Sequence, residues 1–210
     1  MKTKILSAVL LAAAANAGAA TYTDRTAFEA AITVGYTETF ESLAPLGTSG
    51  ITGPIGLPTG LTVSSPTNDL FSVGPGQSTN PTEAIGSNFP PTDFLIFSLG
   101  GAYKAFGADF FQNFGGGSQS GADDTYELRF FSAGSLIDSI TGIVASDGGS
   151  FLGYVSALGS FDTVEVFSLG NAFEVADNVT VGDGEAVPEP ATFALLGLGL
   201  LGLGLSRRNK

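Results

Sequence analysis

Oxygen atoms supply almost all the reactive chemistry of this chain. Its 210 residues include no cysteine and no histidine, which excludes a disulfide framework, a thiol nucleophile, a Ser-His-Asp triad and the usual zinc and iron sites. A glycosidase needs only two carboxylates, but nineteen acidic residues lie between Thr21 and Ala186 and their spacing selects no pair. The chain also lacks tryptophan, the residue that most often stacks on sugars, and has five tyrosines. We therefore expect no catalytic residue and no enzyme activity.

The region from Thr21 to Ala186 is strongly acidic. Three cations, Arg25, Lys104 and Arg129, stand against its nineteen acidic residues, so the net charge is −16. Proteins bind nucleic acid by neutralising phosphate with lysine and arginine, and we expect no nucleic-acid partner. Such a charge keeps a protein soluble outside the cell, and an acidic body of this kind can accept divalent cations.

The N-terminus, residues 1–20, has the pattern of a secretory signal peptide. Two lysines precede an apolar segment, Ile5–Ala15, and small residues follow it in the small-x-small order that signal peptidase cleaves. Three cleavage positions fit this order, after Ala17, Ala19 or Ala20. We expect the chain to be exported.

The C-terminus, residues 185–210, combines a turn, an apolar run and a basic end. Proline disfavours helix at its own position and before it, so we expect an extended chain up to the start of an uncharged hydrophobic helix at 191–205. Basic residues mark the cytoplasmic side of a membrane segment. The turn consists of Val187, Pro188, Glu189 and Pro190, and the basic cluster of Arg207, Arg208 and Lys210.

This C-terminal combination resembles the PEP-CTERM sorting signal, which occurs on exported proteins of Gram-negative bacteria that also make extracellular polysaccharide. The resemblance implies processing at the Pro-Glu-Pro region by the membrane protease exosortase. It also implies export through the inner membrane to the cell envelope, the cell surface or the extracellular matrix. An ordinary membrane anchor is the alternative, but the apolar run of 15 residues is shorter than the roughly 20 that span a bilayer.

The body between these signals is predicted to be all-β, a two-sheet antiparallel sandwich occupying residues 21–184. Short runs rich in Phe, Val, Ile and Tyr alternate with turn-forming residues, and almost no helix is expected. The predicted strands are Tyr36–Ser42, Leu61–Ser64, Leu70–Val73, Phe94–Leu99, Lys104–Phe111, Thr125–Ser132, Ser135–Ile140, Ser150–Ser156, Thr163–Ser168 and Ala172–Val181. Two sets of alternating residues are predicted to share a face: Phe106, Ala108 and Phe110, and Tyr126, Leu128 and Phe130.

The remaining segments of the body are predicted as one helix and two loops. Thr23 caps a helix that ends near Val34, with an apolar stripe that packs on a sheet. The segments Ala44–Gly60 and Gly74–Pro91 carry most prolines of the body and are expected to be loops.

The second half of the body resembles the jelly-roll bodies common among PEP-CTERM proteins. The resemblance lies in strand sequences such as Ala105–Phe110, Tyr126–Phe131 and Phe173–Val179, and the architecture is shared with carbohydrate-binding modules. It implies one structural calcium, held by Asp177 and Asn178 near the last strand together with backbone carbonyls. Calcium takes six to eight oxygen ligands, and oxygen ligands are what this chain offers. A strand edge or turn without metal is the alternative at Asp177 and Asn178.

Three functions remain open at this stage. The first is a non-catalytic exported protein of the cell surface or biofilm matrix, sorted by an exosortase and associated with exopolysaccharide. A lectin-like carbohydrate-binding module is the alternative, and a carboxylate-based glycosidase is the third hypothesis.

Overall fold

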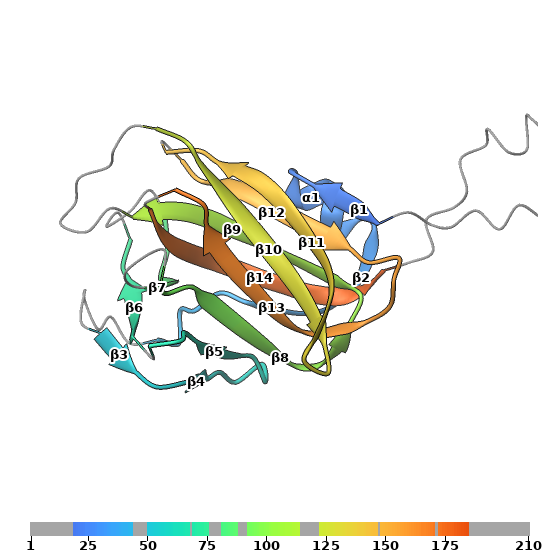
Figure 1. Ribbon diagram of the computed structural model, residues 1–210, viewed down its shortest axis with the longest axis horizontal. Helices are drawn as coiled ribbons and strands as arrows, with labels where there is room; N and C mark the ends of the chain where they lie inside the picture. Colours follow the sequence, from blue (N-terminus) through green and yellow to red (C-terminus); the bar gives the residue numbers. More distant parts are fainter. Residues whose placement is uncertain are drawn as a thin grey trace, which may run out of the picture. The chain divides into compact units, whose positions relative to one another are not determined.

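The computed structural model describes most of the body of the chain. The described residues are 19–43, 50–67, 69–75, 81–87, 92–113, 122–146, 148–170 and 172–184. They belong to one compact unit, Ala19–Glu185. Two antiparallel β-sheets make up this unit (Figure 1). The prediction of an all-β, two-sheet sandwich with one short helix is confirmed.

The two sheets contain eight and six strands. Sheet A has the order β1 (Ala20–Tyr22), β12 (Ser150–Val155), β9 (Ala105–Asn113), β14 (Phe173–Gly184), β7 (Ala84–Ser87), β6 (Asp69–Val73) and β3 (Gly50–Thr52), and β2 (Ile32–Glu38) also pairs with β14. Sheet B has the order β11 (Ser135–Val144), β10 (Asp124–Ser132), β13 (Phe161–Ser168), β8 (Leu95–Tyr103), β5 (Thr62–Ser64) and β4 (Ile55–Gly56).

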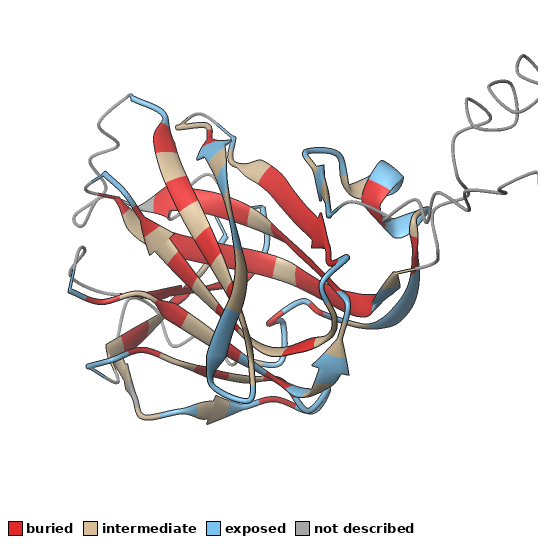
Figure 2. Cartoon of the chain, turned by 45° about the vertical axis from the view of Figure 1, so that its right-hand side comes forward, coloured by how far each residue is buried: buried red, intermediate tan, exposed pale blue. Residues whose placement is uncertain are grey.

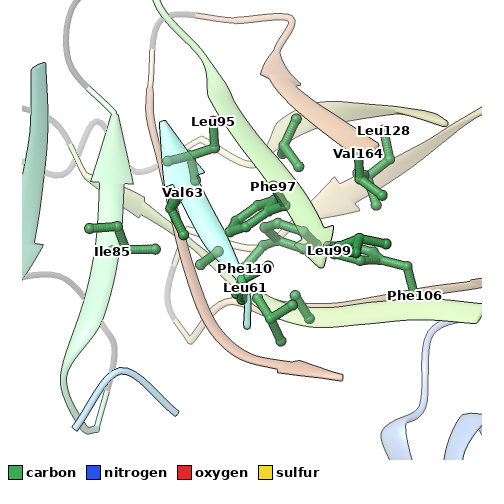
Figure 3. Close-up of a cluster of buried hydrophobic side chains, with 14 of the residues drawn as sticks. Leu61, Val63, Ile85, Leu95, Phe97, Leu99, Phe106, Phe110, Leu128 and Val164 are labelled. Atoms are coloured by element: carbon green, nitrogen blue, oxygen red, sulfur yellow. The ribbon is translucent and has the colours of Figure 1, made fainter. Parts of the chain in front are cut away.

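Phenylalanine fills the core from both sheets. The two predicted sets of alternating residues, on β9 and on β10, are fully buried, which confirms that each set faces inward. Figure 2 shows buried positions alternating with less buried ones along strands of the sandwich. Phe97 of sheet B meets Phe106 of sheet A with ring centroids 5.7 Å apart, and their neighbours fill the same cluster (Figure 3). Phe130 of β10 stacks on Tyr154 of β12 at 4.2 Å. Burial of each such side chain stabilises the fold by about 1.5–3 kcal/mol, so these rings hold the two sheets together.

The predicted helix from Thr23 to Val34 is too long. Helix α1 spans Arg25–Glu29, and its N-cap is Asp24, whose Oδ1 accepts a 2.7 Å hydrogen bond from the amide of Ala27. Strand β2 begins at Ile32, where three β-branched residues follow one another. Such residues favour strands over helices, and the pairing of β2 with β14 decides the outcome.

Parts of the two predicted loops are strands. Strands β3 and β4 lie within Ala44–Gly60, and β7 lies within Gly74–Pro91. These strands have two to four residues each, too short for an alternating pattern to emerge. Gly86 of β7 also permits a close approach to β14, because a Cβ there would lie 3.1 Å from the carbonyl oxygen of Glu174.

The last strand of the body lies in the interior of sheet A. Strand β14 pairs with β9 on one side and with β7 and β2 on the other. Sheet A is therefore complete only when the final strand, Phe173–Gly184, pairs with strands that precede it in the sequence. The strand also carries the residues predicted to bind calcium.

Among the described residues, no helix is both long and apolar enough to cross a membrane. The hydrophobic segment 191–205 and residues 1–18 of the expected signal peptide lie outside them.

Candidate functional site

The residues predicted for sorting lie outside the described part of the chain. They are Val187, Pro188, Glu189, Pro190, Arg207, Arg208 and Lys210. The residues predicted for calcium, Asp177 and Asn178, lie within β14. The structure therefore shows the surroundings of the predicted calcium residues, whereas the sorting residues are known from the sequence alone.

Asp177 and Asn178 lie at a β-bulge of β14. The pairing of β14 with β9 shifts register between Asp177 and Thr180. Asn178 has a φ of 49°, in the left-handed region that asparagine tolerates better than most residues. Its side-chain Nδ2 donates a 3.0 Å hydrogen bond to Oδ2 of Asp109 on β9. The bulge thus brings two strands' polar groups together on the side of sheet A where α1 packs.

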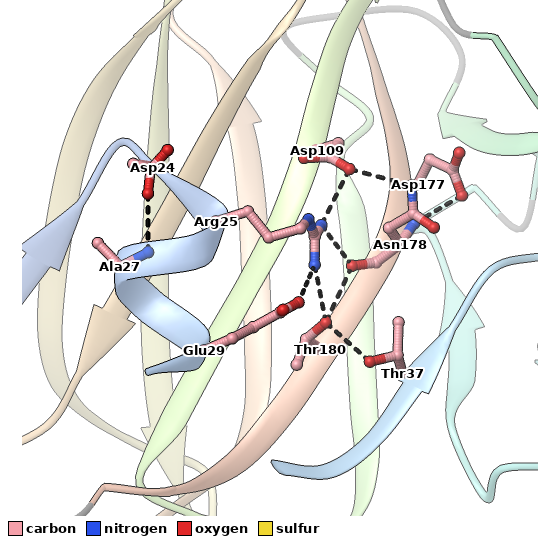
Figure 4. A network of polar contacts seen from close by, with 9 residues as sticks. All are labelled: Asp24, Arg25, Ala27, Glu29, Thr37, Asp109, Asp177, Asn178 and Thr180. Carbon is pink, nitrogen blue, oxygen red and sulfur yellow. Dashed lines mark hydrogen bonds and ion pairs between the residues drawn. The ribbon is translucent and has the colours of Figure 1, made fainter. Parts of the chain in front are cut away.

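The guanidinium of Arg25 in α1 joins this bulge to the helix (Figure 4). Nη2 donates to the carbonyl oxygen of Asn178 at 2.8 Å and pairs with Oδ2 of Asp109 at 3.0 Å. Nη1 donates to Oγ1 of Thr180 at 2.9 Å and to Oε1 of Glu29 at 3.2 Å. Forked guanidinium donors suit such multiple acceptors. We call these five residues the Arg25 network.

Asp177 lies beside the Arg25 network and is fully buried. Its Oδ2 accepts from the hydroxyl of Thr82 at 2.5 Å, and its Oδ1 accepts from the amide of Asn178 at 2.6 Å. The pKa of Asp177 is raised to about 6. Burial is the largest cause and the charges of Asp109 and Glu41 add to it, whereas the two hydrogen bonds lower the pKa. The carboxyl therefore titrates well above the usual range of aspartate.

This arrangement does not fit a calcium ion as it stands. Both carboxylate oxygens of Asp177 already accept hydrogen bonds, and Asp109 is paired with a guanidinium. Among the described residues, no group of three or more His, Cys, Asp or Glu side chains is placed to hold a metal. Calcium binding at Asp177 and Asn178 stays a prediction from the sequence. In the structure the positive charge beside these residues is the guanidinium of Arg25, which bonds to the carbonyl oxygen of Asn178 and to Asp109.

A second polar region lies on the outer face of sheet B. Phe94, just before β8, stacks on Phe167 of β13 with ring centroids 4.1 Å apart and an interplanar angle of 29°. The guanidinium of Arg129 on β10 lies 4.1 Å from the centroid of the Phe167 ring. Arg129 also donates to both carboxylate oxygens of Glu127, at 3.0 and 2.8 Å. Together with Glu165, these residues form what we call the Phe167 platform.

Glu165 completes the Phe167 platform on β13, the strand between β10 and β8. It is the register partner of Arg129 on β10 and of Ile96 on β8. Burial raises the pKa of Glu165, and the charge of Arg129 opposes that rise. The platform is partly exposed and is built from flat groups, the rings of Phe94 and Phe167 and the guanidinium of Arg129, with the Phe167 ring packed between the other two. Such surfaces can stack on an apolar ligand face, with carboxylates at hand to accept hydrogen bonds from hydroxyls.

The interior at one end of the sandwich holds a third polar cluster. Glu174 of sheet A accepts hydrogen bonds from the amide of Ser168 in sheet B and from the hydroxyl of Ser87. The hydroxyl of Ser168 donates to Oδ2 of Asp124 at 2.5 Å. Burial raises the pKa of Glu174 to about 7, and the hydrogen bonds oppose that rise. Glu174 and Asp124 are 1% and 9% exposed, so we interpret this cluster as a tie between the sheets.

The class defined by these observations is an acidic two-sheet sandwich with one outer face braced by α1 and another carrying an aromatic platform. The family model of the PEP-CTERM protein-sorting motif matches residues 186–208. The chain therefore carries this sorting motif directly after the body.

Two further comparisons concern the whole chain. No curated protein matches it. A solved structure similar to it is the CBM22-1–GH10 part of endo-1,4-β-D-xylanase 10B from Clostridium thermocellum, in complex with xylohexaose. The identity is 12% and the TM-score 0.42. The match covers 71% of this chain and 28% of the xylanase chain, so this chain spans less than a third of that protein.

Proposed function

We propose that this chain is an exported, non-catalytic protein of the cell surface or extracellular matrix, sorted through its tail by an exosortase and associated with exopolysaccharide. The observation that carries the proposal is the sorting motif at residues 186–208. The strongly acidic body supports it, because such a charge keeps a sandwich soluble and dispersed outside the cell.

Intact mass and fractionation of the protein from its native cells test the sorting step. We expect loss of the N-terminal signal and of the tail near Pro188, with the body released or held in the matrix. Replacing Pro188 and Pro190 by alanine should keep the tail attached and the protein in the membrane fraction. A wild-type chain that is intact through Lys210 and stays in the membrane would contradict the proposal and favour a permanent anchor.

The Phe167 platform supports a second function for the same body, carbohydrate binding. Sugar rings present apolar faces that stack on aromatic rings, and their hydroxyls donate to carboxylates. The partly exposed group of Phe94, Phe167 and Arg129, in which Phe167 is packed between the other two, would supply the first requirement. Glu127 and Glu165 supply the second. The net charge of −16 favours a neutral glycan over an acidic one.

Co-sedimentation of the exported protein with the insoluble exopolysaccharide of its own producer tests this second function. We expect saturable binding that Phe167→Ala weakens about tenfold, corresponding to roughly 1.4 kcal/mol. Leu158→Ala is the matched control, because Leu158 is 68% exposed and lies away from the platform. Equal binding by both variants would remove the platform from the proposal. Release of soluble sugar would instead favour the glycosidase.

A further inference from the structure

The sheet edges of this body differ sharply in length. Sheet A ends on β1 and β3, which have three residues each, and sheet B ends on β4, which has two. Strand β2, which is off the main path of sheet A, has seven residues and pairs with β14, and its Tyr36 packs edge-on against Tyr103. The other end of sheet B is β11, with ten residues. Natural proteins keep unpaired edges short or charged because such edges pair readily with other strands.

The backbone of β11 is paired on one side over its full length. Its ladder with β10 runs from Ser132↔Ser135 to Asp124↔Val144. Among the described residues, no strand pairs with its other side. In an antiparallel strand, alternate residues direct their N–H and C=O groups to opposite sides. About half of the backbone polar groups of β11 therefore point away from β10, along an edge about 33 Å long.

The side chains of β11 make this edge apolar at both ends. Leu136 and Ile143 are 56% and 58% exposed. They lie opposite Phe131 and Thr125 of β10, which places both on the outer face of sheet B. The ladder has a bulge at Ile137, which is why residues an odd number apart share that face. Two of the large exposed hydrophobic side chains in the described body thus flank the middle of one edge strand.

The charge of β11 is unusual for such an acidic body. Asp138 is the one charged residue among its ten, and the strand has no lysine and no proline. The hydroxyl of Tyr154 on β12 donates a 2.5 Å hydrogen bond to Oδ2 of Asp138, so this carboxylate is turned toward sheet A. Two copies with a net charge of −16 each repel one another over most approaches. Along β11 the strand itself brings one carboxylate from each copy to the contact, and that carboxylate already accepts a hydrogen bond from Tyr154.

We propose that β11 pairs with β11 of a second copy of this chain, antiparallel and around a twofold axis near Ser139. A closed twofold dimer uses the same patch on both subunits. Antiparallel pairing about Ser139, with the bulge at Ile137 taken into account, places Leu136 of each copy opposite Thr141 and diagonally next to Ile143 of the other, on the same face. The contact joins two six-stranded sheets into one continuous sheet. It leaves both Phe167 platforms available, and if the platform binds carbohydrate as proposed above, a dimer offers a repeating polysaccharide two sites.

Sedimentation of the exported protein over a wide concentration range tests this contact. We expect a concentration-dependent dimer, and Ile143→Lys should raise its dissociation constant about tenfold or more. Leu169→Lys is the matched control, because Leu169 is 56% exposed and lies in the turn after β13. A monomer at every concentration, or a dimer that both variants weaken equally, would overturn the proposal.

A covalent trap keeps the test decisive if Ile143→Lys does not fold. The chain has no cysteine, so a single Ser139→Cys substitution introduces one exposed thiol at the expected axis. Opposite Cα atoms of an antiparallel pair lie about 4.5–5.5 Å apart, within the range that a disulfide bridges. We expect a covalent dimer on mild oxidation of Ser139→Cys and none for Leu158→Cys. Equal crosslinking of the two variants would sink the proposal.

Discussion

Two arginines of the body make similar contacts and occupy very different surroundings. Arg25 lies 4.7 Å from the centroid of the Phe151 ring, and Arg129 lies 4.1 Å from that of Phe167. Arg25 bonds to Asp109 and to residues of β14 more than 150 positions away. Arg129 bonds to Glu127, two positions along its own strand. One arginine therefore connects distant parts of the chain, whereas the other is held in place by its own sheet.

The difference assigns different roles to the two outer faces. On sheet A, Arg25 and α1 attach the N-terminal segment to β9 and β14, so the polar groups there are used for folding. On sheet B, the Arg129 guanidinium and the Phe94–Phe167 stack are partly exposed on the outer face and, among the described residues, connect no distant segment to the sheet. A side chain that is not needed to hold the fold is the one that remains available for a ligand.

Loss of the Arg25 contacts should have the largest effect on stability. Arg25→Ala leaves Asp109, 24% exposed at its side chain, without its cation and the carbonyl of Asn178 without its donor. Removing one partner of a buried pair costs about 3–5 kcal/mol, and because this pair is partly exposed we expect a loss of about 3 kcal/mol. Urea unfolding followed by circular dichroism measures the change.

Arg25→Lys sharpens this first prediction. Lysine keeps the charge but lacks the planar fork that reaches several acceptors, so we expect a loss between wild type and Arg25→Ala. A change below about 0.5 kcal/mol for Arg25→Ala, the level of an exposed ion pair, would contradict the idea that this arginine holds the fold.

Two glutamates differ in the same way, because Glu174 is buried and hydrogen-bonded between the sheets whereas Glu165 is partly exposed on the platform. This difference predicts a pH dependence of stability. Burial raises the pKa of Glu174 to about 7 from an ordinary value of 4.5. Because the folded state holds the proton more tightly than the unfolded state, the stabilising contribution is complete below pH 4.5. It is lost as the pH rises through 7. The loss is on the order of 3 kcal/mol.

Glu174→Gln and Glu165→Gln test this dependence as a matched pair. We expect the urea midpoint of wild type to fall between about pH 5 and 8, and Glu174→Gln to flatten that fall. Glu165→Gln should follow wild type closely, because Glu165 is partly exposed on the platform. Asp177, whose pKa is raised to about 6, contributes in the same direction and remains in both variants. Identical profiles for Glu174→Gln and wild type would refute the assignment.

Arg129→Ala should change stability much less than Arg25→Ala. Its ion pair with Glu127 is partly exposed, with 37% of the arginine side chain accessible, and such pairs contribute about 0–1 kcal/mol. We expect a loss below about 1 kcal/mol in urea unfolding, together with weaker retention on exopolysaccharide. A loss as large as that of Arg25→Ala would erase the distinction between the two faces.

The sequence predicted the sandwich because its long strands alternate. In β10, buried Tyr126, Leu128 and Phe130 alternate with partly exposed residues, and this period identifies an inward face without knowledge of neighbours. The same rule predicted the inward face of β9. The rule did not identify β3 and β4, which have three and two residues, or β7, whose four residues are all buried.

The Phe167 platform and the Arg25 network could not be predicted in the same way. Phe94 and Phe167 are separated by 73 positions and meet because β8 pairs with β13. The cation–carboxylate contact of Arg25 and Asp109 depends on the packing of α1 and on a bulge of β14. Alternation specifies which face a side chain occupies, but not which strands become neighbours or where a ladder slips.

Calcium is expected to have the smallest effect. The Arg25 guanidinium already pairs with Asp109, and both oxygens of Asp177 accept hydrogen bonds, so a calcium ion would have to displace these partners. We expect the thermal midpoints in calcium chloride and in EDTA to agree within about 1 °C. This corresponds to a change in the free energy of unfolding below about 0.3 kcal/mol. A midpoint that rises with calcium and returns with EDTA would support the predicted site at Asp177 and Asn178, and Asp177→Asn should then abolish the rise. That outcome would also mean that the face of sheet A next to α1 can exchange its arginine for a metal, which would bring its behaviour closer to that of the open face of sheet B.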